Sequence, residues 1–172
     1  MAAKFVGSQE PLKDMRDVQQ KNGGLVPYVE RDHQGRLIKA SGRIHGNMEL
    51  AKGTRVNGPA RQLIKGKGDG SDDAGHIIPC SCGGSGQSTD NLYPQNAHIN
   101  RGAQAQMDRS IAESLMSDSN HSVVFEVGFI YEDTQHPDRP SYVYQHMDTY
   151  INDKLQSSIR DGDPNFRNSE TR

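Results

Sequence analysis

Short apolar runs, each bounded by Gly, Asp or Asn, recur through the first third of the 172-residue chain. Runs of this length between turn-forming residues are typical of β-strands joined by tight turns. They predict strands at residues 25–29, 37–40 and 43–50, with a further short strand at 62–64. The polar residues before them predict an arm or connector that contains a short helix at about residues 12–20.

The second half of the chain changes to a helical period. Apolar residues recur every four positions and predict one helix with a single apolar stripe, formed by Ile99, Ala103, Met107, Ile111 and Leu115. Residues 122–131, rich in Val, Phe and Ile, predict the strongest strand, and residues 142–146 predict its antiparallel neighbour across a turn at 137–140. Together these elements predict an α+β fold with a central antiparallel sheet and flanking helices.

The composition predicts a modest core and many loops. Only 32% of residues are hydrophobic, while the chain has 18 Gly, 8 Pro and no Trp. The length fits one domain, predicted at residues 23–159, after the arm at 1–22 and before a charged tail at 160–172 that is expected to be mobile. No run approaches the ~18 apolar residues of a membrane span, and residues 1–11 lack the apolar centre of a signal peptide.

The net charge of -2 and the pI of about 6.4 argue against a protein that coats nucleic acid by bulk attraction. The charge is unevenly distributed, however. Between residues 51 and 67 there is no carboxylate, and the charged residues are Lys52, Arg55, Arg61, Lys65 and Lys67. This stretch predicts either a local basic surface or a solvated loop.

The segment that follows a Gly-rich loop carries the first candidate for catalysis. It reads DDAGH over residues 72–76 and continues into two Ile residues that should be buried. A His side chain accepts a proton near neutral pH, because its unperturbed pKa is about 6.5, so His76 is a candidate general base. The other six histidines are expected to be structural: His33, His45, His98, His121, His136 and His146.

Amide side chains form the next two candidates. The run NLYPQ covers residues 91–95, and Asn100 shares a predicted helix face with Gln104 and Asp108. Amide oxygens suit hard cations and are poor ligands for zinc or iron, which favours Mg²⁺, Mn²⁺ or Ca²⁺. An ordinary exposed helix face is the alternative for this trio.

These blocks, DAGH at 73–76, NLYPQ at 91–95 and NRGA at 100–103 with Asp108 beyond, resemble the DNA/RNA non-specific endonuclease family of the ββα-metal, or His-Me finger, superfamily. The signature of that family reads DRGH, then NxxPQ, then NxG, then an acidic residue. The nine-residue step from Asn91 to Asn100 is preserved. The resemblance covers about residues 64–115 and implies a ββα-metal motif that hydrolyses phosphodiester bonds in DNA, RNA or both.

By position, the resemblance makes His76 the base that deprotonates water and Asn100 the direct protein ligand of a single Mg²⁺, for which Mn²⁺ can substitute. Asp73 would orient the water shell of the metal. Asn91 would brace the site, and Asp108 would hold a water of that shell.

Two positions depart from the family pattern. Ala74 stands where the family usually has Arg, so a phosphate-binding cation is expected from elsewhere. The candidates are Arg61, Lys65, Lys67 and Arg101. Asp108 stands where Glu is more frequent and is shorter by one methylene.

Other interpretations of the sequence are also open. The loss of Arg at position 74 also fits an inactive nuclease-like module that binds nucleic acid or protein. Cys80 and Cys82 are too close for an unstrained mutual disulfide, and a zinc site with His76 or His98 lacks a second Cys pair. No recognition helix or aromatic stacking motif is visible, so little sequence specificity is expected.

The resemblance also suggests a biological setting. Nuclease domains of this kind often serve as toxic cargo that bacterial delivery systems carry into target cells, commonly with a neutralising immunity protein as partner. The sequence therefore predicts DNA or RNA as substrate, an immunity protein as partner and no membrane association.

Overall fold

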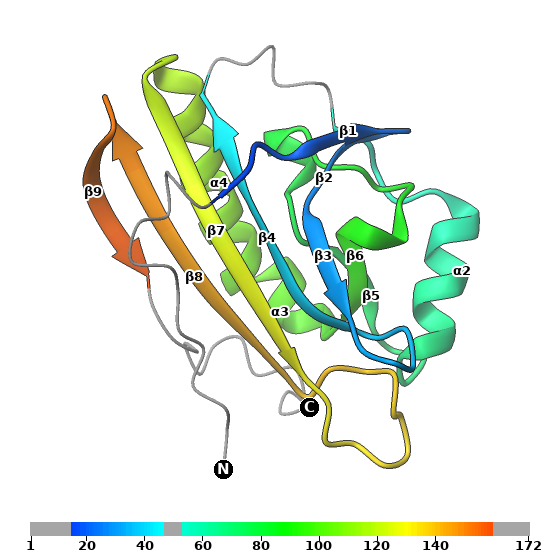
Figure 1. Cartoon of the computed structure of the whole chain (residues 1–172). Coiled ribbons are helices and arrows are strands. Elements are labelled where there is room, and N and C mark those ends of the chain that lie inside the picture. The colour runs from blue at the N-terminus through cyan, green and yellow to red at the C-terminus, as the bar shows by residue number, and fades with distance from the viewer. Residues whose placement is uncertain (1–14, 47–52, 160–172) are drawn as a thin grey trace.

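A five-stranded antiparallel sheet forms the centre of the molecule (Figure 1). The computed structural model describes residues 15–46 and 53–159. The strand order is β3 (Tyr28–Arg31), β4 (Leu37–His45), β7 (His121–Ile130), β8 (Tyr142–Ile151) and β9 (Lys154–Ile159). The predicted α+β class with a central antiparallel sheet is confirmed. None of the helices in the described part of the chain is long and apolar enough to cross a membrane.

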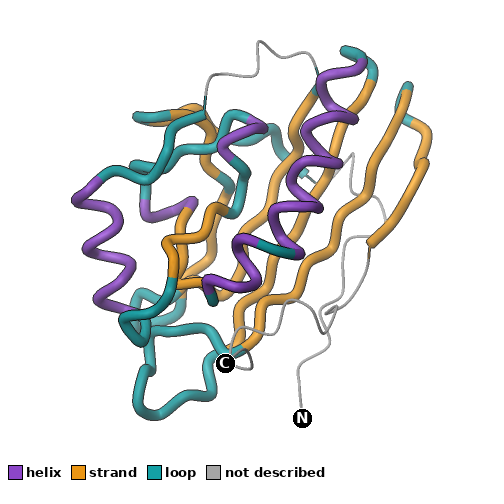
Figure 2. Tube along the Cα trace, turned by 180° about the vertical axis from the view of Figure 1, so that it is seen from behind, coloured by secondary structure: helices purple, strands orange, loops and turns teal. Residues whose placement is uncertain are grey.

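Alternation along β7 explains how this sheet makes a core. Side chains two positions apart share a face of a strand, and the buried apolar residues on one face of β7 are Val123, Phe125, Val127 and Phe129. Helix α4 (Ala103–Ser117) lies along the sheet, in front of it in Figure 2 and behind it in Figure 1. Its residues Ala112 and Leu115 belong to the same buried cluster, so the main core lies between α4 and the sheet.

A separate hairpin and a short helix stand beside this sheet. Strand β5 (Asp73–His76) pairs antiparallel with β6 (Leu92–Gln95), and α3 (Ala97–Arg101) follows β6 almost directly. Tyr93 of β6 packs edge-on against Phe129 of β7, with ring centroids 5.2 Å apart, which attaches the hairpin to the main sheet. Two antiparallel strands followed by a helix are the order of elements that the resemblance implied.

Helix α2 (Gly58–Lys67) covers residues 62–64, so the strand predicted there was wrong. The side chain of Asn57 accepts a hydrogen bond from the backbone N–H of Ala60 and caps the helix, and a Pro lies in the first turn, where its missing N–H costs nothing. Ala60 and Ile64, one turn apart, are buried against Leu92 of β6. The apolar run at 62–64 is thus part of a longer amphipathic helix.

The predicted single helix over residues 99–115 is two helices, α3 and α4. The break lies at Gly102, whose backbone angles of φ -104° and ψ -103° are not helical. Ile99 and Leu115 are both buried, so the apolar stripe was predicted correctly and the interruption was missed.

The N-terminal helix prediction is wrong for the residues that are described. Asp17 forms a bridge with Arg43 of β4, and β1 (Gln19–Lys21) pairs with β2 (Gly24–Val26). The run at 25–29 is divided between β2 and β3, while the runs at 37–40 and 43–50 belong to the single strand β4 as far as His45. Residues 12–14, 47–50 and the predicted tail at 160–172 lie outside the described residues.

The last two strands of the described chain are β8 and β9. The predicted neighbour of β7 at residues 142–146 is confirmed, and β8 continues beyond it to Ile151. Strand β9 was not predicted, because all six of its residues are exposed and carry no apolar alternation. A tight turn with Asn152 and Asp153 at φ 50° and 62° joins it to β8.

Candidate active site

Asp73, the first residue of β5, is held by two consecutive residues of α3. Asn100 Nδ2 donates to Asp73 Oδ2 over 2.9 Å, while Nε and Nη2 of Arg101 donate to Oδ2 and Oδ1 over 2.9 and 2.7 Å. Burial raises the pKa of the Asp73 carboxyl, but the hydrogen bonds from Arg101 and Asn100 and the charges of Arg101 and Lys65 outweigh it and lower the pKa from 3.8. Asp73 is therefore an anion at neutral pH.

His76, at the other end of β5, is oriented by a backbone carbonyl. Its Nε2 lies 3.0 Å from the carbonyl oxygen of Thr54. A carbonyl oxygen can only accept a hydrogen bond, so Nε2 carries the proton in the neutral ring and Nδ1 keeps its lone pair. Burial lowers the pKa of His76 from 6.5, although the Thr54 contact opposes this shift. The neutral, proton-accepting ring is therefore the main form at pH 7.

Thr54 is itself fixed at three points. Its N–H donates to the Gly84 carbonyl over 3.0 Å, its hydroxyl donates to the Gly23 carbonyl over 2.5 Å, and the same hydroxyl accepts from Gly86 N over 2.9 Å. The carbonyl that orients His76 is thus anchored to two loops. Sequence reasoning missed Thr54, because every residue has a carbonyl oxygen and no motif marks this one.

Asn91 joins the two ends of the long connection between β5 and β6. It has no exposed surface, its Oδ1 accepts from Ile78 N over 2.7 Å, and its Nδ2 donates to the carbonyls of Ile78 and Ser85 over 3.0 and 2.9 Å. A buried side chain with all these bonds made holds the loop in one conformation. This geometry is that of a brace, and the contribution of Asn91 to catalysis stays a prediction.

Gln95, the last residue of the NLYPQ block, lies across the backbone of Gly75. A Cβ atom added at Gly75 would lie 2.1 Å from Gln95 Oε1, so the close packing requires glycine there. Gln95 is 2% exposed and pairs with Asp73 in the hairpin register. Its Oε1 accepts no hydrogen bond within the described residues. The Gly of the first block and the Gln of the second therefore fit each other.

The chain is similar to known nucleases. Residues 16–148 match the family model described as DNA/RNA non-specific endonuclease. The chain belongs to this family. A curated relative, the probable deoxyribonuclease RhsA of Dickeya dadantii (strain 3937), is 29% identical over 126 residues, which is 73% of this chain and 8% of the relative. The chain thus spans less than a tenth of that protein's length. The family resemblance predicted from the three blocks is confirmed.

At position 74, where the family usually has Arg, the structure has a packed alanine. Ala74 packs against the buried cluster of Ala60, Ile64 and Leu92, beneath α2. An Arg from this position is absent, and Arg101 is the residue whose guanidinium contacts Asp73.

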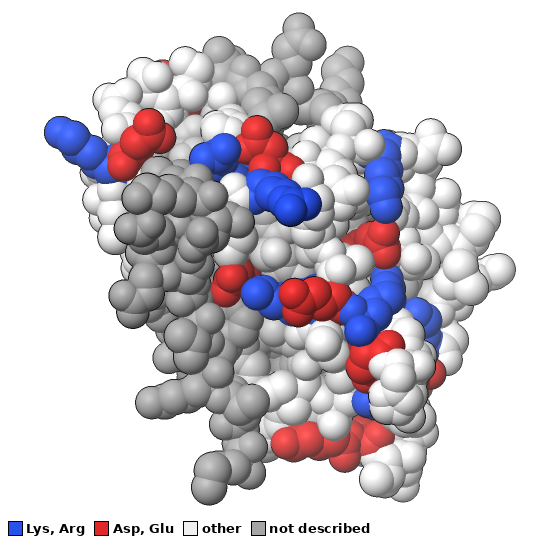
Figure 3. All heavy atoms as spheres, in the orientation of Figure 1, with Lys and Arg blue, Asp and Glu red and all other residues white. Residues whose placement is uncertain are grey.

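The four predicted phosphate-binding cations are not equivalent. Lys65 lowers the pKa of Asp73 through its charge. Arg101 lowers it through its charge and through direct hydrogen bonds. Arg61 donates to the Val56 carbonyl over 3.2 Å, and Lys67 lines a separate hollow beside β6. On the face drawn in Figure 3, Lys and Arg alternate with Asp and Glu rather than forming a continuous basic surface.

Asp108 is hydrogen-bonded within α4 and lies beside a largely apolar hollow. Its Oδ1 accepts from Gln104 Nε2 over 2.8 Å, and Gln104 Oε1 accepts from Gln145 Nε2 over 2.8 Å. The carboxyl borders a hollow lined mainly by apolar residues of the sheet and of the segment 77–79 that follows β5. Burial raises the pKa of Asp108 to about 6. No polar contact links it to Asp73, His76 or Asn100 within the described residues, and its place in a metal's water shell stays a prediction.

Replacing Asp108 with Asn is expected to stabilise the protein above pH 6 by up to about 3 kcal/mol. The folded state keeps the Asp108 proton between pH 3.8 and about 6, where the unfolded chain has lost it, so this group makes stability fall as pH rises through that window. The Asn variant lacks this fall and keeps an acceptor for Gln104. Urea unfolding of both proteins at pH 4 and pH 7.5 measures the difference. Equal pH slopes would contradict the raised pKa, and a loss of cleavage by the variant would support the role in the metal shell.

The two cysteines lie in a short 3-10 turn, η1 (Cys80–Cys82), between β5 and β6. Cys82 is fully buried, and burial raises the pKa of its thiol to about 12. In residues 15–46 and 53–159 no group of three or more His, Cys, Asp or Glu side chains is placed to hold a metal ion. A metal site built on one amide oxygen is of a different kind, because Asn is not among those residue types.

Proposed function

We propose that this chain is a Mg²⁺-dependent, non-specific nuclease that hydrolyses phosphodiester bonds of DNA, RNA or both, with His76 as the general base. Its membership of the DNA/RNA non-specific endonuclease family supports the reaction class. The observation that carries the assignment of the base is the contact between His76 Nε2 and the Thr54 carbonyl, because it leaves Nδ1 free to accept a proton.

His76 deprotonates the attacking water. Water has a pKa near 15.7 and is a weak nucleophile at neutral pH, so a positioned base raises the rate by about 10²- to 10⁴-fold. The lowered pKa of His76 keeps the ring neutral in this pH range. The anchored Thr54 carbonyl holds the ring plane in one direction, so the proton is transferred to the same atom, Nδ1, in each turnover.

Asn100 and Asp73 are the residues that would hold a Mg²⁺ ion, for which Mn²⁺ can substitute. Asn100 Nδ2 is bonded to Asp73, while its Oδ1 makes no hydrogen bond with the described residues and remains available as a hard oxygen ligand. When bound, the cation stabilises the negative charge that grows on the phosphate and on the leaving 3′-oxygen. A neutral amide ligand would leave most of the cation's charge uncancelled, and the ionised Asp73 would orient the water around it.

Arg101 and Lys65 are the cations proposed to contact the phosphate backbone. Both lie close enough to lower the pKa of Asp73, and Arg101 presents a largely exposed side chain. Contacts of this kind position a substrate and carry no sequence information. They therefore support cleavage with weak sequence preference and without a requirement for a 2′-hydroxyl.

We further propose that the domain acts as a toxic cargo nuclease with an immunity protein as partner. The support is the similarity to a protein named probable deoxyribonuclease RhsA, of which this chain matches a small part. Co-purification from cells that also express the gene next to its own would test the partner.

Digestion of supercoiled plasmid and of total RNA by the purified chain tests the enzymatic proposal. We expect cleavage of at least one substrate with Mg²⁺ or Mn²⁺, and complete loss of it with excess EDTA, because one amide ligand holds a metal weakly. Re-addition of Mg²⁺ to the EDTA-treated protein should restore the rate. Cleavage that persists in EDTA would refute metal dependence, and no cleavage with any divalent metal would favour an inactive binding module.

A further inference from the structure

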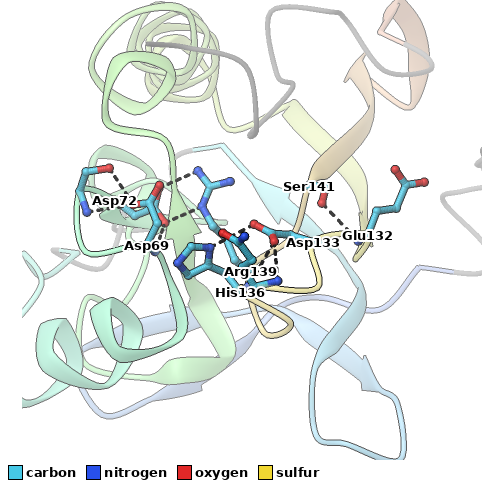
Figure 4. A network of polar contacts seen from close by, with 9 residues as sticks. Asp69, Asp72, Glu132, Asp133, His136, Arg139 and Ser141 are labelled. Carbon is cyan, nitrogen blue, oxygen red and sulfur yellow. Dashed lines mark hydrogen bonds and ion pairs between the residues drawn. The ribbon is translucent and has the colours of Figure 1, made fainter.

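A buried ion pair holds the residue that precedes Asp73. Arg139 lies in the loop between β7 and β8, 67 positions from Asp72 in the chain. Its Nε donates to Asp72 Oδ2 over 2.7 Å and its Nη2 donates to Oδ1 over 2.8 Å (Figure 4). The two side chains are only 6% and 1% exposed. Two parallel bonds from a planar guanidinium fix both the distance and the direction of a carboxylate.

The space around the buried Asp72 carboxylate is closely filled. Asp69 N donates to Asp72 Oδ2 over 3.2 Å, and a Cβ added at Gly68 would lie 2.3 Å from the same oxygen. Asp72 is joined by one peptide bond to Asp73, where β5 begins. A displacement of Asp72 is therefore transmitted directly to the first residue of β5.

The loop that carries Arg139 is itself firmly attached. His136 Nδ1 lies 3.1 Å from Asp133 Oδ2, and the Ser141 hydroxyl accepts from Glu132 N over 3.2 Å (Figure 4). On its other side, Arg36 Nη1 donates to the Pro137 carbonyl over 2.9 Å. These contacts order the loop from which Arg139 reaches Asp72.

We propose that Arg139 is a positioning residue of the nuclease site, which acts through Asp72 to hold Asp73 in reach of Asn100 and Arg101. The inference rests on the proposed function and adds the β7–β8 loop to the site. Substitution of Arg139 leaves a carboxylate buried without its partner, and the start of β5 shifts to expose it. A shift of about 1 Å at a catalytic group can cost 10²-fold in rate.

The test compares Arg139→Lys with Arg36→Gln as the matched control. Lys keeps the charge and loses the two-pronged contact. Arg36 gives the same loop only one exposed hydrogen bond and makes no hydrogen bond or ion pair with residues 68–73 among the described residues. Thermal unfolding followed by circular dichroism identifies a temperature at which the unaltered protein and both variants are fully folded. There, we expect Arg139→Lys to lower kcat by about 100-fold with KM changed less than about threefold, and Arg36→Gln to keep the rate of the unaltered protein.

A third variant separates positioning from folding. Asp72→Asn with Arg139→Gln removes both charges, so no uncompensated carboxylate remains if Arg139→Lys fails to fold. We expect this double variant to fold and to cut slowly. A rate like that of the unaltered protein in either folded variant, or an equal loss in Arg36→Gln, overturns the inference while the proposed function stands. An unaltered protein that cuts nothing overturns both.

Discussion

Replacing His76 with Gln is expected to lower kcat for plasmid and RNA cleavage by about 10²- to 10⁴-fold, the range that a positioned general base contributes. Gln keeps an N–H group that can donate to the Thr54 carbonyl and fills much of the same space. It has no nitrogen that accepts a proton near neutral pH. Initial rates with Mg²⁺, together with circular dichroism to show that the variant is folded, measure the effect.

His98→Gln is the matched control for this variant. His98 is exposed on α3, close in sequence to Asn100, and its side chain makes no hydrogen bond with the described residues. The same chemical change there should leave the rate within about twofold of the unaltered protein. If His76→Gln cuts within about tenfold of the unaltered protein, another group is the base.

The pH dependence of kcat/KM tests the role of His76 independently. A general base must be unprotonated, so kcat/KM falls as pH falls through the pKa of His76. Burial lowers this pKa from 6.5, so we expect the acid limb below pH 6.5. The residual activity of His76→Gln should lack this limb. An acid limb that is unchanged in the variant would assign the titration to a different group.

Which residues lie together at the candidate site was easier to predict from the sequence than the contacts that support them. Asp73 and Asn100 are 27 positions apart, yet they belong to a hairpin and a following helix, and this local order brings them within 2.9 Å. A motif with fixed spacing can encode such a contact because few residues intervene. The same holds for Gly75 and Gln95, because the Gln95 side chain packs against the Gly75 backbone within the same hairpin.

The supports escaped prediction because they come from distant segments or from the backbone. Arg139 meets Asp72 across 67 positions, and nothing in the sequence around Arg139 distinguishes it from a surface residue. Thr54 acts through its carbonyl. Helix α2 was mistaken for a strand because a window of three apolar residues is too short to show a helical period, while its cap at Asn57 lies outside that window.

Replacing Asn100 with Ala is expected to abolish metal binding and to lower kcat by about 10²- to 10³-fold, the usual loss when one group that stabilises transition-state charge is removed. The side chain supplies an amide oxygen next to Asp73 that accepts no hydrogen bond from the described residues. Without the Asn100 amide, Asp73 remains paired with Arg101, and the positive charge of Arg101 opposes the binding of a metal ion there. Titration with Mn²⁺, followed by electron paramagnetic resonance without nucleic acid, measures binding independently of cleavage.

Asn100→Asp separates the two properties that the amide combines. A carboxylate oxygen can still ligate the metal, but its negative charge, next to Asp73, cancels part of the charge that attracts a polyanion. We therefore expect this variant to bind Mn²⁺ at least as tightly as the unaltered protein, with a higher KM for DNA and a lower kcat. Gln106→Ala, which removes an exposed amide from α4, is the control and should change neither quantity. Unchanged Mn²⁺ affinity in Asn100→Ala would remove Asn100 as the ligand, and full activity in Asn100→Asp would show that the neutrality of the amide is not what the site requires.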